Sequence, residues 1–300
     1  YTRACNFYHG TQAQILIKKK LALPLCGNKS LAFDHIEILS RKKKTRIIHL
    51  KKINLLDKFT KKIVQKDIKK IVEKKTNLNK NLKFSEPIIM GILNLTPDSF
   101  SDGGLFNQSQ KAFSHIQHMI KKGANIIDIG GESTRPGSKD ITSKMEWSRL
   151  EKVFTKFKKK YPKTFLSVDT RKSEVMLKAI KNKSDLINDV SGFNYDINAI
   201  DKVKNFNVWK VLHHMQGTPK TMQVNPKYKN VLLDLYDFFE NKLNTDFKKF
   251  KFKKFIIDPG IGFGKILKHN IKLISKISIF HSLGFPILVG NSRKRFIKEI

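Results

Sequence analysis

The chain has 300 residues, of which 40% are hydrophobic, and its 60 Lys and Arg against 25 Asp and Glu give a formal net charge of +35. This apolar content is enough for a substantial core, which excludes a chain that is disordered throughout. No run approaches the roughly 18 to 20 consecutive apolar residues that a membrane-spanning helix needs. The two cysteines, Cys5 and Cys26, provide neither a disulfide framework nor the spacing of a zinc site. We therefore expect a soluble, cytoplasmic protein.

The basic charge also raises the question of a nucleic-acid partner, since basic stripes bind phosphate backbones. Here nearly all of the excess is lysine, and it accompanies abundant Ile, Asn and Phe, as expected of a gene that drifts toward A and T. We interpret most of the charge as a solvated surface. Nucleic-acid binding is accordingly not expected.

Residues 1–85 form the more basic part of the chain, with 22 Lys and Arg against 5 Asp and Glu. No acidic residue precedes Asp34. The start of the chain therefore resembles an organelle-targeting segment, although it contains few Arg and Ser residues. We predict a lysine-rich extension of unknown role over 1–85, and organellar import stays open. Tyr1 is not a methionine, so the chain is expected to begin inside a longer product.

An amphipathic helix is predicted near the end of this extension, because apolar residues recur there every three or four positions between lysines. These residues are Leu56, Phe59, Ile63, Val64, Ile68, Ile71 and Val72. We expect the helix to pack on its own domain. The alternative is a protein that binds an anionic membrane or nucleic acid through residues 1–85.

From residue 86 the pattern becomes that of an α/β protein. Short apolar runs occur at 88–93, 126–129, 165–168, 186–187, 208–212, 255–257 and 286–289, and helical spacing separates them at 113–120, 175–180 and 231–250. Such units in series, without a nucleotide-binding glycine motif, favour a (β/α)₈ TIM barrel over 86–300. A (β/α)₈ barrel has eight strand-and-helix units, and the sequence up to Val289 supplies only seven strands. The last strand and helix are therefore expected to be missing, unless the leading segment contributes a strand.

Polar side chains close most of these apolar runs. Asp169, Asn188, Asp258 and Lys294 follow four of them, and in a barrel such positions converge on the carboxyl-terminal rim. Turns and helix caps also favour Asp, Asn and Ser, which explains residues such as Ser101, Ser173 and Asp189. A carboxylate or an ammonium at a barrel mouth needs a partner, however.

The chemistry of this set is specific. Two carboxylates and an amide can bind a flat heterocycle that is rich in N–H donors, and Lys294 can bond its ring oxygen or nitrogen. The glycine-rich segments 94–104 and 128–138 add hydroxyls, backbone N–H groups and Arg135, which suit phosphate oxygens. Together these features point to a pterin with a diphosphate side chain.

Seven motifs carry a resemblance to a known family. NLTPDSFSDGG, DIGGESTRPGS, SVDTRK, INDVSG, HHMQGTPKTMQ, IDPGIGFGK and VGNSRK resemble, in order and spacing, those of bacterial-type dihydropteroate synthase, and the match runs from about Pro87 to Ile300. The methyltetrahydrofolate methyltransferases are similar in the middle strands but not in the first two motifs. A pterin-binding domain of the methyltransferase type is the alternative to a dihydropteroate synthase, and the first two motifs speak against it.

The resemblance implies an enzyme that joins p-aminobenzoate to 6-hydroxymethyl-7,8-dihydropterin diphosphate with Mg²⁺ as cofactor. It implies catalytic roles for Asp169, Arg135 and Lys294. It implies pterin binding by Asp128, Asp169, Asn188, Met215, Asp258, Phe263 and Lys294, p-aminobenzoate or diphosphate binding by Thr134, Arg135, Pro136 and Ser292, and metal binding by Asn94. A homodimer is also implied.

The sequence departs from the family at its end. The family carries an arginine and histidine motif on its last strand that helps to bind the diphosphate, and nothing after Ile300 supplies it. We expect either a fragment of a longer product or a decayed copy. A barrel without its closing strand exposes unpaired edges, so we expect these 300 residues to be inactive alone.

Overall fold

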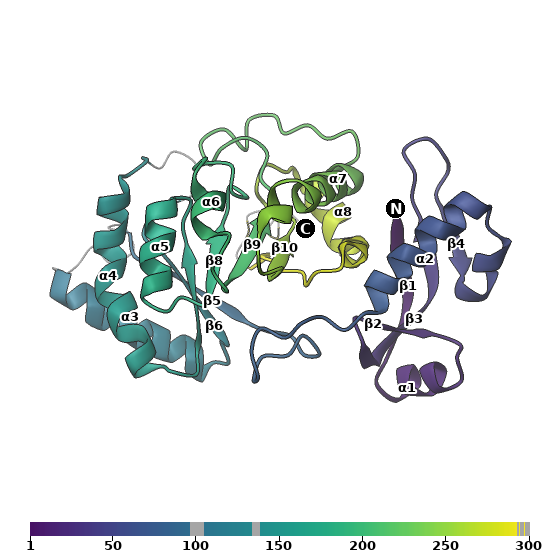
Figure 1. Cartoon of the computed structure of the whole chain (residues 1–300), viewed down its shortest axis with the longest axis horizontal. Coiled ribbons are helices and arrows are strands. Elements are labelled where there is room, and N and C mark those ends of the chain that lie inside the picture. The colour runs from purple at the N-terminus through teal and green to yellow at the C-terminus, as the bar shows by residue number, and fades with distance from the viewer. Residues whose placement is uncertain (97–104, 134–138, 293, 295–296, 298–300) are drawn as a thin grey trace.

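The computed structural model describes the chain except for residues 97–104, 134–138, 293, 295–296 and 298–300. The described residues form two separate sheets, an antiparallel one of four strands and a parallel one of six (Figure 1). The antiparallel sheet comes from the basic leading segment. The parallel sheet belongs to the part in which the sequence predicts a barrel.

The leading segment is a small α/β unit, which lies at the right of Figure 1. In chain order its elements are β1 (Thr2–His9), α1 (Gly10–Lys18), β2 (Leu23–Leu25), β3 (Asn28–Ile38), β4 (Arg46–His49), the 3-10 helix η1 (Leu50–Leu55) and α2 (Lys58–Val72). The long β3 pairs with each of the other three strands, all antiparallel. This segment therefore contributes no strand to the parallel sheet.

Helix α2 is the amphipathic helix that the sequence predicts. The side chain of Asp57 accepts a hydrogen bond from the backbone N–H of Thr60 at 2.9 Å, which caps the first turn. Val64 and Ile71 are buried in the core of the unit, as expected, whereas Phe59 is 74% exposed. Most of the apolar face thus packs on its own unit.

The parallel sheet has the order β10-β9-β8-β7-β6-β5, with helices between the strands. Its elements are β5 (Met90–Asn94), α3 (Leu105–Lys121), β6 (Ile126–Gly130), α4 (Ser143–Lys160), β7 (Phe165–Asp169), α5 (Ser173–Lys181), β8 (Leu186–Asp189), α6 (Ala199–Val203), β9 (Trp209–His213), α7 (Val231–Asn244), η3 (Asp246–Lys249), β10 (Phe255–Asp258), α8 (Leu267–Ser275) and η4 (Ile277–Leu283). Every strand pairs with its sequence neighbour. This is part of a (β/α)₈ barrel, and six of the seven predicted strands are confirmed.

The seventh predicted strand, 286–289, is not formed at its predicted length. It is reduced to a single parallel bridge between Ile257 and Ile287. Ile257 donates to the carbonyl of Pro286 and accepts from the N–H of Leu288, both at 2.8 Å. In the described part of the chain, β10 is the only strand bridged to residues 286–289. Because these residues have a neighbouring strand on one side only, few backbone hydrogen bonds are available to lengthen the strand.

Residues 78–88 cover the amino-terminal end of the parallel sheet. Leu78, Leu82 and Phe84 pack with the first residues of the strands, among them Trp209. The indole N–H of Trp209 donates to the carbonyl of Leu78 at 3.1 Å. This end of the barrel is a packed floor, so the opposite, carboxyl-terminal end is the one available for a site.

The leading unit docks on the last helices of the barrel through a buried carboxylate. Glu37 of β3 accepts hydrogen bonds from Arg3 and from Lys276, which directly precedes η4, both at 2.5 Å. Burial by itself would raise the pKa of Glu37, but the bonds from Lys276 and Arg3 outweigh it and hold the pKa below its ordinary value. None of the helices among the described residues is both long and apolar enough to cross a membrane.

Candidate active site

A row of polar side chains runs across the carboxyl-terminal ends of four neighbouring strands. Asn94 of β5 lies opposite Gly130 of β6, Gly130 opposite Asp169 of β7, and Asp169 opposite Asn188 of β8. Because the strands are parallel and in register, these residues share one edge of the sheet. The structure thus brings together three of the predicted site residues.

Gly130 makes the convergence possible. A Cβ atom at this position would lie 3.2 Å from Oδ2 of Asp169 and 3.4 Å from Oδ1 of Asn94. The missing side chain therefore leaves room for a carboxylate and an amide to approach each other above the end of β6.

Asp128 lies deeper in the same sheet, two residues before Gly130. Its Oδ2 accepts a hydrogen bond from the side-chain amide of Asn188 at 2.8 Å. Its Oδ1 is buried and makes no well-formed hydrogen bond in the described part of the chain, although the nearby hydroxyl of Ser167 acts to lower the pKa of Asp128. A buried acceptor without a partner is rare in folded proteins, and it fits a place where a ligand donates an N–H.

Asp128 and Asp169 influence each other's ionisation. Burial raises the pKa of Asp128. Burial, followed by the negative charge of Asp128, raises the pKa of Asp169 well above its ordinary value. Two carboxyls held in this way resist ionising together, and bound N–H donors would favour the ionised forms.

A second group of predicted residues lies at the ends of β9 and β10. One oxygen of Asp258 accepts from the N–H of Gly260 at 2.8 Å. The Lys294 ammonium lies 4.0 Å from the centre of the Phe263 ring, which meets the His213 ring edge-on at 4.8 Å. Burial lowers the pKa of Lys294, while the nearby charge of Asp258 acts to raise it. Aromatic face, cation and carboxylate thus lie together, as the binding of a flat polar ring requires.

Lys265, which is not among the predicted site residues, supports this group. Its buried ammonium donates to the carbonyls of Phe263 at 2.8 Å and His214 at 3.3 Å, which ties the segment after β10 to the one after β9. Burial lowers the pKa of Lys265 to about 7. The signal that could have found it is its place after three glycines in IDPGIGFGK.

The comparison with known proteins identifies the family. A family profile described as "Pterin binding enzyme" matches residues 90–300. The dihydropteroate synthase of Escherichia coli K12 is 40% identical over 221 residues, which cover 73% of this chain and 78% of that protein. The dihydropteroate synthase of Neisseria meningitidis serogroup B is 41% identical and covers 72% of this chain and 77% of its own. The chain belongs to the dihydropteroate synthases.

Solved dihydropteroate synthases agree with this assignment. A structure of the Yersinia pestis enzyme with a sulfonamide drug is 38% identical with a TM-score of 0.65, and it covers 73% of this chain and 80% of its own. The Xanthomonas albilineans enzyme with 4-aminobenzoic acid is 36% identical with a TM-score of 0.66, at 73% and 77% coverage. These matches confirm the predicted fold class, family and enzyme class, which is a transferase.

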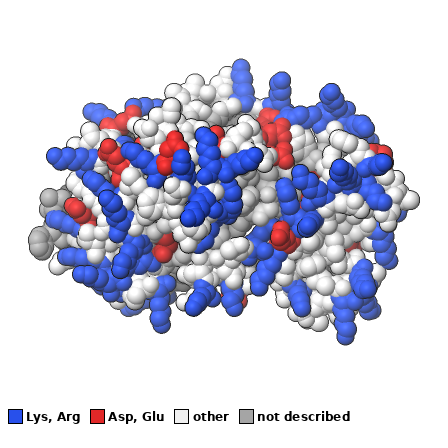
Figure 2. Space-filling view, viewed as in Figure 1, with Lys and Arg blue, Asp and Glu red and all other residues white. Residues whose placement is uncertain are grey.

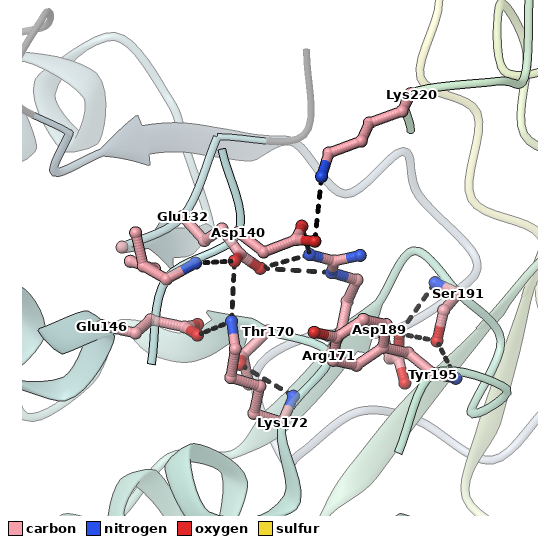
Figure 3. A network of polar contacts seen from close by, with 12 residues as sticks. Glu132, Asp140, Glu146, Thr170, Arg171, Lys172, Asp189, Ser191, Tyr195 and Lys220 are labelled. Atoms are coloured by element: carbon pink, nitrogen blue, oxygen red, sulfur yellow. Dashed lines mark hydrogen bonds and ion pairs between the residues drawn. The ribbon is translucent and has the colours of Figure 1, made fainter. Parts of the chain in front are cut away.

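A network of buried ion pairs, which is not among the features predicted from the sequence, borders the active-site edge in this dihydropteroate synthase (Figure 3). Arg171 and Lys172, just beyond the end of β7, both bond to the buried carboxylate of Glu132, just beyond the end of β6. Burial by itself would raise the pKa of Glu132, but hydrogen bonds from Lys172 and Arg171 hold it below its ordinary value. Only the adjacency of SVDTRK and DIGGESTRPGS in the barrel order hinted at such a contact.

The remaining predicted residues are placed only in part. Met215 is half-buried just after β9, and Ser292 is exposed beyond the bridge at Ile287. Thr134, Arg135 and Pro136 lie outside the described residues, as does Ser101. Asp189 accepts hydrogen bonds from the backbone N–H groups of Ser191 and Phe193, as expected of a turn residue.

The donor set of this dihydropteroate synthase suits a Mg²⁺ ion that arrives with a phosphate. No cluster of three or more His, Cys, Asp or Glu among the described residues could hold a metal ion. Asn94, however, is exposed, and its Oδ1 approaches the same point above Gly130 as Oδ2 of Asp169. Mg²⁺ typically uses one or two protein oxygens together with phosphate oxygens and waters, so these residues fit it.

Proposed function

We propose that these residues carry the site at which p-aminobenzoate is joined to 6-hydroxymethyl-7,8-dihydropterin diphosphate, and that the row formed by Asn94, Asp169 and Asn188 is its reaction centre. The observation that carries the proposal is the buried Oδ1 of Asp128, which has no described partner, beneath Asp169 and Asn188. A pterin edge offers adjacent N–H donors to such acceptors.

The pterin ring would be held between the two groups of residues. Asp128, Asp169 and Asn188 would bind its N–H edge. Asp258 and Lys294 would bind the opposite polar atoms, with the Phe263 ring against the pterin face. Met215 would line the same pocket. This arrangement fixes the exocyclic CH₂ group relative to the sheet edge, which lowers the entropic part of the barrier.

The reaction itself needs no nucleophilic side chain. The amine nitrogen of p-aminobenzoate forms a bond to the exocyclic CH₂. The C–O bond breaks with its electron pair leaving on diphosphate, and the amine releases one proton. As that bond weakens, positive charge develops on the pterin, and the ionised carboxylate of Asp169 would stabilise it.

The diphosphate would lie toward β5 and the segments that follow β5 and β6. Asn94 would hold Mg²⁺, which supplies positive charge against the departing diphosphate. Thr134, Arg135, Pro136 and Ser292 would contact p-aminobenzoate or the diphosphate. Arg135 suits this role because a guanidinium binds phosphate oxygens in pairs.

The test is the substitution Asp169→Asn, which keeps the shape but removes the charge. We expect turnover to fall by roughly a hundredfold or more, as for the loss of a group that stabilises transition-state charge. Binding of a non-reactive pterin, measured by calorimetry, should weaken less than turnover falls. Asp201→Asn on the exposed part of α6 is the matched control. An unchanged rate in Asp169→Asn would refute the assignment.

The alternative is a pterin-binding domain of the methyltransferase type, which needs no diphosphate. Incorporation of p-aminobenzoate decides between the two. The homodimer and the cytoplasmic location remain proposals, and sedimentation and cell fractionation test them.

A further inference from the structure

The segment 260–265, which follows β10, is held by hydrogen bonds from side chains to four successive carbonyls. These bonds run from Gln223 to Gly262 at 2.9 Å, from Lys265 to Phe263 at 2.8 Å, from Tyr228 to Gly264 at 2.8 Å and from Asn270 to Lys265 at 3.3 Å. The backbone N–H of Phe263 also donates to the carbonyl of Gly260 at 3.0 Å. Both polar groups of the Phe263 backbone are therefore held.

Phe263 needs such bonds because both of its neighbours are glycines. Gly262 has a φ of +80° and Gly264 a φ of +61°, left-handed values that favour glycine. Glycine has more backbone conformations open to it than any other residue, so two of them leave this short segment free to rearrange unless other contacts prevent it. The position of the Phe263 side chain therefore depends on the residues that hold its backbone.

Lys265 is the donor that joins Phe263 to the neighbouring strand end. Its ammonium also donates to the carbonyl of His214, just after β9, at 3.3 Å and lies 3.2 Å from Nδ1 of the same residue. Lys265 is only 3% exposed, and none of these partners is a carboxylate. Burial of an ammonium without a hydrogen-bonded counter-charge is costly, so stability alone gives little reason for a lysine here. A role in fixing geometry accounts for it better.

The Phe263 ring lies among the groups at the ends of β9 and β10. Its centre is 4.8 Å from that of the His213 ring, and the Lys294 ammonium lies 4.0 Å from it. A rotation of the Phe263 peptide would move the ring relative to both groups. The bond from Lys265 to the Phe263 carbonyl opposes such a rotation.

We propose that Lys265 is a positioning residue that holds the Phe263 ring against the bound pterin. The inference rests on the proposed function, which places this ring on the pterin face. In the described part of the chain, the hydrogen bonds of the Lys265 ammonium go to Phe263 and His214. Loss of the ammonium should therefore weaken pterin binding, and the effect should depend on the presence of the Phe263 ring.

The experiment is a double-mutant cycle on the protein. Calorimetry at pH 7 measures the Kd of 6-hydroxymethylpterin, which has no diphosphate to lose. Lys265→Met keeps the length of the side chain but removes the donor, and Phe263→Leu removes the ring but keeps an apolar side chain. We expect Kd to rise roughly fivefold to tenfold in Lys265→Met, the effect of one well-placed aromatic contact. In the Phe263→Leu background the same substitution should change Kd by less than roughly twofold, because the ring that it positions is gone.

The control is Lys210→Met, which removes another buried ammonium. Lys210 lies near the amino-terminal end of β9 and donates to the carbonyl of Phe206 at 2.9 Å, so its loss should leave Kd unchanged. Melting temperatures of all variants show whether each is folded. Lys265→Gln, which keeps a shorter N–H donor without the charge, gives the same comparison should Lys265→Met not fold.

Two results would overturn the proposal. One is an unchanged Kd in the Lys265 variant, and the other is the same rise in Kd with and without the Phe263 ring. A wild-type protein that does not bind 6-hydroxymethylpterin would contradict the proposed function instead, so the two failures are distinguishable.

Discussion

At the scale of single residues, the site depends on two carboxyls that cannot both ionise easily. Asp128 is buried with one oxygen unpartnered in the described chain, and its charge raises the pKa of Asp169. In the proposed mechanism the pterin needs acceptors, so the productive form would have Asp169 ionised. The rate should therefore increase with pH as Asp169 loses its proton.

This coupling gives a prediction for Asp128→Asn. Removing the charge of Asp128 should lower the pKa of Asp169, so the acid limb of kcat/KM should move to lower pH, although the maximum rate falls with the lost pterin contact. The measurement is a pH profile of kcat/KM for wild type, Asp128→Asn and the control Asp201→Asn. An acid limb that stays in place or moves to higher pH would contradict the coupling.

The sequence places a polar side chain correctly where that side chain directly closes a buried strand. Asp169, Asn188 and Asp258 lie at strand ends, as predicted, because their strands are short apolar runs. Their roles in binding and catalysis stay predictions. Lys265 and Arg171 were missed because their role depends on contacts between strand ends that are distant in the chain. Glu132 and Arg171 are 39 residues apart, and no periodicity marks their contact.

At the scale of elements, the network of ion pairs joins the residues just beyond β6 to those just beyond β7. Glu132 is its centre, with Arg171, Lys172 and the N–H of Ile141 as donors. These donors depress the pKa of Glu132 in the folded state. A carboxyl with a depressed folded pKa stabilises the fold at pH values above its unfolded pKa, and that stabilisation is lost as the pH falls.

The corresponding prediction concerns Glu132→Gln. At pH 7 the free energy of unfolding should fall by about 3 kcal/mol, because two buried cations lose their counter-charge. As the pH falls from the ordinary value of 4.5 through the lower pKa of the folded state, wild-type Glu132 also becomes neutral, so the difference between the two proteins should narrow. Urea unfolding at several pH values measures it. A difference that does not depend on pH would contradict the role given to this charge.

Two elements show why boundaries were harder to predict than strand positions. The helical pattern over 231–250 is divided into α7 and η3, because the chain turns at Thr245 and Phe247 then packs against Phe193 and Phe255. The run 286–289 has the composition of a strand, but β10 is the only described strand that bridges to it. Tertiary contacts, and not local propensity, decide both cases.

At the scale of the whole molecule, the leading segment was the least predictable part. Its helix α2 follows from apolar spacing, but the antiparallel sheet does not, because β3 pairs with β1 about thirty residues earlier. The burial pattern of β3 also lacks a clean alternation. Figure 2 shows Lys and Arg spread over the visible face of both units, with Asp and Glu in small groups among them. This spread supports the interpretation of the charge as a solvated surface.

The proposed function is decided by one measurement, the conversion of labelled p-aminobenzoate by the protein with the pterin diphosphate and Mg²⁺. We predict one labelled dihydropteroate for each diphosphate released, and a roughly hundredfold or larger fall in the rate of formation of both products in Asp169→Asn. Pterin binding without incorporation of p-aminobenzoate, or methyl transfer from methyltetrahydrofolate, would contradict it.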